Sequence, residues 1–567
     1  MNQIMSYLKP YYFKMLIGLI IKTTGTIVEL ALPWILSYMI DDIIPLKNVN
    51  YILIWGGIML CCAIAALICN TVANRMASSV ARDTTEHIRN DLFSKIINLS
   101  NHQVDNFTLP SLVSRVTTDT YNIHQIVGMM QRLGVRAPIF LVGGTIITLT
   151  LDPVLTLVMI AVMPIIFVTI YIVSKYGIPM YTLVQKRIDD YVRVVRENIT
   201  GIRVIKALSK EEYEKKKFDA CNSATATQEK KTGMVMSSVN PMMQVCLNVG
   251  TVLVILAGAY RVNSGAIKPG IIIAFLTYVT LILNALLFIS RIFTNYSKAS
   301  ASAKRIVEVL NAPDEMGVID LPKVRNDYCV EFDHVSFSYD GKEDNLTDIS
   351  FGIKKGQTLG IIGATGSGKS TIVKLLMRFY DVNEGAIRIN GEDIRSMDIK
   401  KLREKFGVVF QNDFISNDTI FENIRFGRDL KEEDVKVAAD YANASEYISE
   451  KPKGFDTVVA IRGADLSGGQ KQRLLIARAM AAHPEILILD DSSSALDYKT
   501  DAAVRKELRE HFKETTTIMI AQRISSIMSA DAICVMEDGN IVGYGTHEEL
   551  INSCDIYKEI AESQMSE

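Results

Sequence analysis

The chain has 567 residues, 49% of them hydrophobic, and a formal net charge of −2. This length exceeds what one hydrophobic core serves and predicts two or three domains, and the balanced charge gives no electrostatic reason to expect a nucleic-acid partner. A mean hydropathy of +0.18 argues against a wholly soluble protein, and the apolar excess is concentrated in the N-terminal part.

Apolar segments of membrane-spanning length follow one another in the N-terminal part. Each is near the ~20 residues that a helix needs to cross a bilayer, and the six occupy 13–44, 51–75, 128–151, 154–176, 240–262 and 270–292. The connections at 75–127 and 177–235 are long and rich in Lys and Arg, whereas the others are short. The positive-inside rule therefore predicts a multi-pass protein of the plasma or inner membrane, with both termini and the C-terminal domain in the cytoplasm.

The two long connections keep helical periodicity over most of their length. The spanning helices are therefore expected to extend well beyond the membrane. Breaks at 106–111 and 198–202 interrupt this periodicity. The residues alone indicate only turns between long helices at these two places.

Polar side chains within the spans are candidates for lining a substrate cavity, because such groups are costly in a bilayer and often functional. Three sets each share one helical face: Lys22 with Glu29, Asn240 with Gln244 and Asn248, and Asn284 with Arg291. Interhelical hydrogen bonds and structural ion pairs explain such residues equally well. Glu29 is the strongest candidate, since it lies well inside its span.

A segment with two prolines, several charges and little periodicity follows the last span, and it is predicted to be a linker. The expected organisation is a membrane domain at 1–310, the linker at 311–327 and a second domain at 328–567. In this second domain, alternating residues predict strands at 328–338 and 345–353, and helices are predicted at 435–450 and 470–482.

A phosphate-binding loop is the main chemical motif of the second domain. It reads Gly363-Ala364-Thr365-Gly366-Ser367-Gly368-Lys369-Ser370-Thr371. Its glycines let consecutive backbone N–H groups turn inward around a phosphate, Lys369 would reach the terminal phosphates, and the Ser370 hydroxyl would contact Mg²⁺. An apolar run precedes the loop and a periodic run follows it, which is the strand–loop–helix context that the motif needs. The predicted ligand is a nucleotide with Mg²⁺.

Two further motifs follow in order. Leu466-Ser467-Gly468-Gly469-Gln470 precedes a predicted helix and offers another arrangement for binding an anion, and Asp490-Asp491 follows the apolar run 486–489. With the phosphate loop, these segments resemble the nucleotide-binding domain of ABC transporters. The six spans resemble the membrane half of an ABC exporter. The fold that this resemblance implies is an α-helical membrane bundle of six spans fused to a cytoplasmic α/β P-loop ATPase domain that uses ATP and Mg²⁺.

The resemblance also implies roles for individual residues. The segment 466–470 corresponds to the family's signature sequence, which contacts the ATP held by the opposite subunit. Tyr339 falls where the family stacks an aromatic ring on adenine, and Gln411 resembles the glutamine that touches Mg²⁺ and the attacking water. Asp490 is the Mg²⁺-associated carboxylate, and Asp497 ends the loop that joins the two nucleotide sites. The breaks at 106–111 and 198–202 correspond to coupling helices.

The chain departs from the family at catalytic positions. Asp491 stands where the family usually has a glutamate that acts on the attacking water, and Gln522 stands where it usually has a histidine. Asp is one methylene shorter than Glu, and an amide cannot titrate near neutral pH as imidazole does. ATP binding is expected to survive and hydrolysis to be slow. Ile461 also replaces the family's usual glutamate before Arg462, which puts a polar contact to the partner's coupling segment in doubt.

The predicted function is one half of a heterodimeric exporter that moves lipophilic or drug-like small molecules, or lipids, by ATP-driven alternating access. The partner chain would carry the intact Glu and His, and this chain's signature would complete the partner's competent site. A homodimer would have two weak sites. Peptide export and a nucleotide-gated channel or regulator remain alternatives, whereas the six spans exclude a soluble ATPase of DNA repair.

Overall fold

The computed structural model describes residues 2–313, 316–411 and 414–565, without the side chains of 2, 166, 167, 170, 173, 174, 178, 239, 240, 243, 287, 290 and 565. Two compact units divide the chain. The helical unit comprises Met1–Ile97 and Pro110–Asn311, and the α/β unit comprises Asn98–Leu109 and Ala312–Glu567. The short segment Asn98–Leu109, which lies between two predicted spans, thus packs with the C-terminal part of the chain.

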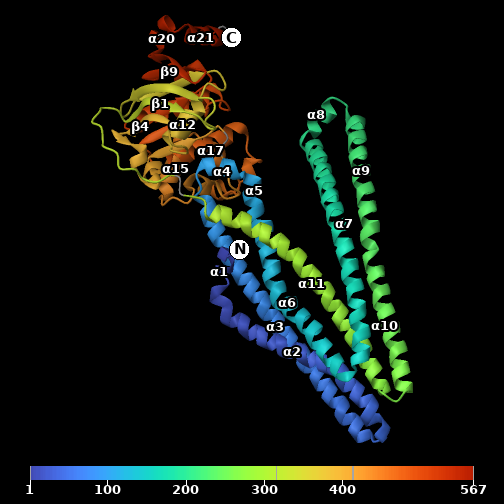
Figure 1. Ribbon diagram of the computed structural model, residues 1–567. Coiled ribbons are helices and arrows are strands. Elements are labelled where there is room, and N and C mark those ends of the chain that lie inside the picture. Colours follow the sequence, from blue (N-terminus) through green and yellow to red (C-terminus); the bar gives the residue numbers. More distant parts are fainter. Residues whose placement is uncertain (1, 314–315, 412–413, 566–567) are drawn as a thin grey trace. The chain divides into compact units, whose positions relative to one another are not determined.

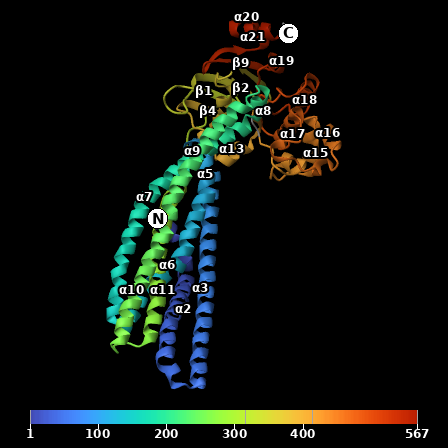
Figure 2. The same cartoon turned by 90° about the vertical axis from the view of Figure 1, so that its right-hand side faces the viewer.

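Long helices make up the helical unit. They are α1 (Asn2–Ser6), α2 (Tyr12–Tyr38), α3 (Val49–Ile97), α5 (Leu109–Ser114), α6 (Thr120–Leu151), α7 (Pro153–Thr200), α8 (Ile202–Ala207), α9 (Glu211–Ser237), α10 (Val239–Asn263) and α11 (Pro269–Leu310). In Figures 1 and 2, α2 and α3 run side by side and join at one end, and α7 and α9 form a second pair that meets at α8.

Five segments of the described residues are long and apolar enough to cross a membrane. They are Lys9–Leu46, Val49–Ile97, Leu109–Leu151, Gln244–Asn263 and Pro269–Leu310. The expected span at 154–176 lies in α7, which begins with the apolar stretch Pro153–Ile165. With 49 residues, α3 measures about 74 Å at 1.5 Å per residue, against about 30 Å of bilayer hydrocarbon. The predicted extension of the spanning helices beyond the membrane is therefore confirmed.

The first predicted break, at 106–111, contains the boundary between α4 and α5. After α3 ends at Ile97, α4 (Asn101–Phe107) begins with a capping box formed by Ser100 and Gln103, and it ends at Thr108, whose φ is +61°. The second break falls at Gly201, between α7 and α8, and α8 ends before Ser209, whose φ is +51°. Each break is thus a turn beside a short helix, with α4 before the first break and α8 after the second.

Two sheets organise the α/β unit. An antiparallel sheet has the order β2-β1-β4-β5, and a mostly parallel one has the order β10-β9-β3-β8-β7-β6. The strands are β1 (Val330–Phe337), β2 (Leu346–Ile353), β3 (Thr358–Gly363), β4 (Glu384–Ile389), β5 (Glu392–Asp393), β6 (Phe406–Val409), β7 (Ile486–Asp490), β8 (Thr516–Ile520), β9 (Ala532–Glu537) and β10 (Asn540–Gly545). Strands β1 and β2 lie where alternation predicted them.

Helices accompany these sheets. Besides α4, they are α12 (Lys369–Leu376), α13 (Ile399–Glu404), α14 (Ile420–Arg425), α15 (Glu432–Tyr441), α16 (Ser445–Ser449), α17 (Gly468–Met480), α18 (Tyr498–His511), α19 (Ile524–Ile527), α20 (His547–Ser553) and α21 (Asp555–Met565). The single helix predicted at 435–450 is wrong. Asn443 adopts a φ of +52°, and its carbonyl accepts a hydrogen bond of 2.7 Å from Arg473, so the chain turns there and divides into α15 and α16.

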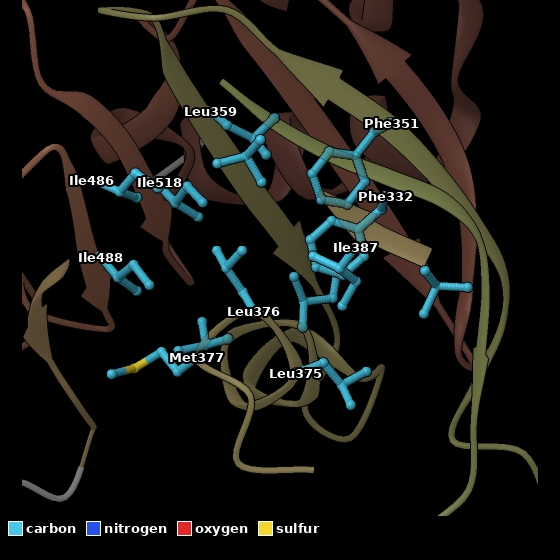
Figure 3. Close-up of a cluster of buried hydrophobic side chains, with 14 of the residues drawn as sticks. Phe332, Phe351, Leu359, Leu375, Leu376, Met377, Ile387, Ile486, Ile488 and Ile518 are labelled. Atoms are coloured by element: carbon cyan, nitrogen blue, oxygen red, sulfur yellow. The ribbon is translucent and has the colours of Figure 1, made fainter. Parts of the chain in front are cut away.

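A buried apolar cluster holds α12 between the two sheets. Figure 3 shows Leu375 and Leu376 of this helix beside Phe332 and Phe351 of the antiparallel sheet and near Ile488 of the parallel one. The two phenyl rings stack with centroids 4.6 Å apart. Because α12 begins at Lys369, this packing fixes the position of the phosphate loop that precedes it.

Candidate functional site

The candidate site lies at the carboxyl edge of the parallel sheet. Gly363 ends β3 and Asp490 ends β7, while Gln411 and Gln522 each follow the last residue of a strand by two positions. Strands β3 and β8, β7 and β8, and β6 and β7 all pair in parallel. Parallel strands bring their carboxyl ends to the same edge, where open α/β sheets bind ligands. The topology therefore gathers residues that are far apart in the sequence.

The phosphate loop curls around the ammonium of Lys369. Lys369 Nζ donates hydrogen bonds of 3.0 Å to the carbonyl of Gly363 and 2.7 Å to that of Ala364. Gly366 and Gly368 have φ of +91° and +98°, conformations that L side chains rarely adopt. A Cβ at Gly366 would meet no heavy atom within 4 Å, so the backbone there is open to a close approach by a ligand.

Two candidate Mg²⁺ ligands, Ser370 and Asp490, come together beside this loop. The Ser370 hydroxyl donates a hydrogen bond of 3.1 Å to Asp490 Oδ2. Among the described residues, no group of three or more His, Cys, Asp or Glu side chains is arranged to hold a metal ion. Mg²⁺ is typically held by one or two protein oxygens and the phosphates of a nucleotide. A hydroxyl and a carboxylate next to an open phosphate loop fit ATP with Mg²⁺.

Burial shifts the pKa values of two charged groups at this site, the carboxyl group of Asp490 and the ammonium of Lys369. It raises the pKa of Asp490, against the opposing effects of the Ser370 hydrogen bond and of Lys369. Burial likewise lowers the pKa of Lys369, and the carboxylates of Asp490 and Asp491 oppose that change. An anionic phosphate would favour the charged ammonium, and a divalent cation would favour the ionised carboxylate.

The two residues that depart from the family contact each other. Gln522 Nε2 donates a hydrogen bond of 2.9 Å to Asp491 Oδ2. Asp491 has a φ of +52°, and its backbone N–H donates to the carbonyl of Ile520 at 2.9 Å, which ties the end of β7 to β8. Burial raises the pKa of Asp491, whereas Lys369 and Arg523 oppose this. The side-chain amide of Gln564 in α21 donates to the Gln522 carbonyl at 2.8 Å, a contact for which the sequence gives no signal.

Tyr339 lies beside α12. Its hydroxyl donates to Thr371 Oγ1 at 3.3 Å, and Lys374 Nζ lies 5.3 Å from the centre of its ring. The ring meets Phe337 and Tyr380 edge to face, with centroids 4.8 and 5.0 Å apart. The structure thus places this aromatic next to the helix that follows the phosphate loop, and its role at adenine stays a prediction.

The segment 466–470 begins α17 and packs against a different loop. Ser467 and Gln470 form a capping box, with Gln470 N donating to Ser467 Oγ at 3.3 Å. A Cβ at Gly469 would lie 3.3 Å from the carbonyl of Ala495, which precedes Asp497, the N-cap of α18. Leu466 is buried, whereas Ser467 and Gly468 are exposed. Gln411 is exposed as well, and its neighbours 412–413 lie outside the described residues.

Helix α4 contacts the rest of the α/β unit through side chains that the sequence analysis did not single out. Tyr380 Oη donates to Asp105 Oδ2 at 2.6 Å, and Gln103 Nε2 donates to the carbonyl of Pro313 at 2.7 Å. Burial, followed by the hydrogen bond to Asp105, raises the pKa of Tyr380. A cavity of about 380 Å³ adjoins this contact, and its lining includes His102, Tyr339 and Tyr380.

The candidate cavity residues of the spans have different surroundings. Glu29 Oε1 lies 2.5 Å from a guanidinium nitrogen of Arg136, and Lys22 is buried beside it. Gln244 and Asn248 are exposed on α10, as are Asn284 and Arg291 on α11. The side chain of Asn240 lies outside the described residues. Of this set, the structure places Glu29 in an ionic contact between helices.

Comparison with known proteins finds a matching family for each of the two units. Residues 15–286 match the family described as ABC transporter transmembrane region, and residues 346–494 match the family described as ABC transporter. The chain is 33% identical to the uncharacterized ABC transporter ATP-binding protein YfiB of Bacillus subtilis over 566 residues, covering 100% of this chain and 98% of that protein. It is 34% identical to the uncharacterized ABC transporter ATP-binding protein Rv1273c of Mycobacterium tuberculosis, covering 98% and 97%.

A solved structure shares the fold. A bacterial Atm1-family ABC exporter with ATP bound matches with a TM-score of 0.82 at 24% identity, covering 98% of this chain and 99% of that one. At this identity the match shows the fold alone. The predicted architecture, a transmembrane helical domain fused to a C-terminal ATPase domain, is confirmed.

Proposed function

Because this chain belongs to the ABC transporter family, we propose that it is one half of a heterodimeric exporter for lipophilic or drug-like small molecules. The family couples ATP hydrolysis to transport across a membrane, and its exporters act as dimers. In this proposal the chain's own nucleotide site hydrolyses ATP slowly. Its exposed Ser467 and Gly468 complete the competent site of the partner chain.

The hydrogen bond between Gln522 and Asp491 carries this proposal. A carboxylate that acts on water accepts a proton through an oxygen lone pair, and here the amide engages one lone pair of Oδ2 through a hydrogen bond of 2.9 Å. The same bond engages one of the two N–H donors of the Gln522 amide, so this side chain is held against Asp491. The shorter Asp side chain adds to this effect, since a misplacement of about 1 Å can cost roughly 100-fold in rate.

ATP binding is proposed to survive at this slow site. The loop around Lys369, the open backbone at Gly366 and the pair Ser370–Asp490 do not involve the two altered residues. Bound ATP would then hold the two ATPase domains closed for long periods, because closure is driven by the higher affinity of the closed state for ATP. Hydrolysis at the partner's site would reopen the dimer.

Helices α4 and α8 are proposed to be the coupling helices. The contacts of α4 with Tyr380 and Pro313 support this role on the side of this chain's own ATPase domain. Helix α8 exposes Ile202 and Val204, and Ile461 of the α/β unit is exposed as well. Where the family has a polar contact through glutamate, we propose an apolar one. Glu29, Asn240, Gln244, Asn248, Asn284 and Arg291 are proposed to line the substrate path.

The test compares this chain alone with its complex. A tagged chain is purified from its own cells in lipid, and any co-purifying ABC half-transporter is sequenced and expressed with it. We expect the partner to carry a glutamate directly after the aspartate that corresponds to Asp490. We also expect the lone chain to bind Mg-ATP and only the complex to hydrolyse it. Brisk hydrolysis by the lone chain would sink the proposal.

A further inference from the structure

The helical unit contains a buried lysine where α2, α3 and α6 pack together. Lys22 on α2 is only 3% exposed. Its ammonium donates hydrogen bonds of 2.8 Å to Asn70 Oδ1 and 3.2 Å to Asn74 Oδ1, both on α3. These partners are neutral amides, so the charge of Lys22 is solvated but not neutralised by them. Ionisable groups within membrane spans are costly and commonly functional.

Two arginines of α6 join this lysine. Arg132, Arg136 and Glu29 all lie within electrostatic range of Lys22. Glu29 accepts from Arg136 at 2.5 Å and from Asn70 Nδ2 at 3.5 Å. The cluster defined by Lys22, Arg132, Arg136 and Glu29 thus holds three cations and one carboxylate. Arg136 Nε is buried and makes no hydrogen bond, so one N–H donor of the cluster has no acceptor.

Small residues bring the helices close enough to form this cluster. A Cβ at Gly25 would lie 2.8 Å from Cys69 Cβ and 3.4 Å from the backbone nitrogen of Asn70. Only glycine therefore allows α2 to approach α3 at this height, one turn from Lys22. On α6, Arg132 Nε donates back to the carbonyl of Gly128 at 3.0 Å, which holds its guanidinium along its own helix.

A shallow, open cavity on one face of α3 continues from the cluster. It has a volume of about 460 Å³, and its lining includes Asn74, Arg75, Ser78 and Arg82. Asn74 belongs to both the cavity lining and the hydrogen bonds of Lys22. The cavity adds two more arginines, Arg75 and Arg82, which lie two turns apart on the same helix. It lies on the side of the cluster that the positive-inside rule places nearer the cytoplasm.

We propose that this cluster binds the anionic headgroup of an amphipathic molecule, a carboxylate, sulfate or phosphate, whose apolar tail lies against the spans. The proposal rests on the proposed export function and names its substrate class. An excess of positive charge around a buried lysine is costly unless an anion compensates it, and Glu29 compensates one of three cations, of which the two arginines are partly exposed. Lipophilic cations would be repelled by the same charges. Glu29 acts as an internal competitor that weakens anion binding and so permits release.

The alternative is a structural network that only holds three helices together. The two hypotheses predict different effects of the Glu29→Gln substitution on anion affinity and on stability. Removal of the carboxylate raises anion affinity if the cluster is a binding site, because the competing charge is lost. A structural network would instead lose stability and gain no affinity. This variant keeps the side-chain volume nearly constant.

The experiment uses the full chain in nanodiscs of zwitterionic phosphatidylcholine. The probe is a fluorescent fatty acid, 11-(dansylamino)undecanoic acid, and its methyl ester is the matched uncharged control. We expect the acid to bind more tightly than the ester, and Lys22→Gln and Arg132→Gln each to weaken binding of the acid on the order of 10-fold while leaving the ester unchanged. Arg196→Gln removes an exposed arginine of α7 and should change neither the affinity for the acid nor the affinity for the ester.

Two further arms complete the test. In nanodiscs with added phosphatidylglycerol, displacement of the acid identifies a lipid headgroup as the ligand, and undisturbed binding identifies a free amphiphile. Equal affinities for acid and ester, or Glu29→Gln without a gain for the acid, would overturn the proposal even if Lys22→Gln does not fold. ATP-dependent uptake of the acid by vesicles that hold the complex is measured separately. If the acid binds selectively but is not taken up, the result contradicts the export function and leaves the anion site standing. If the acid is taken up and the variants do not change its uptake, the result contradicts the anion site and leaves the export function standing.

Discussion

The side-chain amide of Gln522 donates a hydrogen bond of 2.9 Å to the carboxylate of Asp491. Gln522 follows β8 and Asp491 follows β7, and these neighbouring strands are in parallel register, with Asp490 opposite Ile520. The two departures from the family therefore form one contact. A change at either position alters the surroundings of the other, so their effects on hydrolysis are not expected to add.

The first prediction concerns this contact. Asp491→Glu lengthens the carboxylate by one methylene, and Gln522→His removes the amide that binds it. We expect the single Asp491→Glu variant to raise hydrolysis only modestly and the double variant to raise it further. A well-placed general base contributes about 10²–10⁴-fold, but groups that act as a unit rarely recover this singly.

The assay for these variants measures ATPase activity in lipid with a partner whose catalytic glutamate is changed to glutamine. This site is then the only source of turnover. Asp490→Asn, which removes the carboxylate beside Ser370, serves as the inactive reference. A double variant that stays as slow as the parent would place the defect elsewhere, most directly in the partner's signature segment.

The second prediction separates the two nucleotide sites of the proposed heterodimer. Ser467→Arg puts a bulky side chain at the exposed N-cap of α17 and should stop most hydrolysis while this chain's own ATP stays bound. Lys369→Ala should instead weaken ATP binding at this chain's own loop, where a charge-assisted contact is worth about 1.5–3 kcal/mol. It should lower transport without abolishing hydrolysis. Trapped-nucleotide analysis distinguishes the sites, and near-normal turnover of Ser467→Arg refutes the assignment.

The third prediction concerns the contact of α4 with the α/β unit. Tyr380→Phe removes the hydroxyl that donates to Asp105 at 2.6 Å. Because both side chains are partly exposed, the loss of stability should stay near or below about 1 kcal/mol. If α4 couples the domains, ATP binding persists while transport per ATP hydrolysed falls. Tyr213→Phe, at an exposed tyrosine of α9, is the matched control. Unchanged coupling in Tyr380→Phe speaks against this role.

The fourth prediction follows from the raised pKa of Asp490. Burial raises this pKa above the ordinary value, so the folded protein retains the Asp490 proton to a higher pH than a free carboxyl group does. Mg²⁺ requires the ionised form, and its binding should release this proton. Mg-ATP affinity should therefore be complete above the raised pKa and decline as pH falls through it.

Calorimetry in two buffers of different ionisation enthalpy measures that proton release. Asp490→Asn should abolish both the release and the acid decline, while nucleotide binding without Mg²⁺ persists. Ser370→Ala is a second variant, since it removes the hydrogen bond of 3.1 Å that lowers the pKa of Asp490. It should move the decline to higher pH. An acid profile that neither variant alters would assign the titration to another group.

The architecture was predictable because its signals are local. Spans follow from apolar length, and the phosphate loop follows from glycines placed between a strand and a helix, which the structure forms as β3 and α12. The contacts that modify the site join distant parts of the chain. Nothing near Gln522 in the sequence indicates Gln564, and nothing near Asp105 indicates Tyr380. The break at Asn443 depends on Arg473 of another helix, so periodicity alone predicted one continuous helix.

The unbroken length of α3 has a mechanical consequence. A rigid rod of about 74 Å converts a small rotation at one end into a large displacement at the other, and a tilt of about 5° moves the far end by about 6 Å, one helical turn. Its 49 residues contain no proline, so bending does not absorb such a rotation at a kink. Proline introduced midway along α3 would make it a hinged lever, whose C-terminal half pivots while its N-terminal half stays in place.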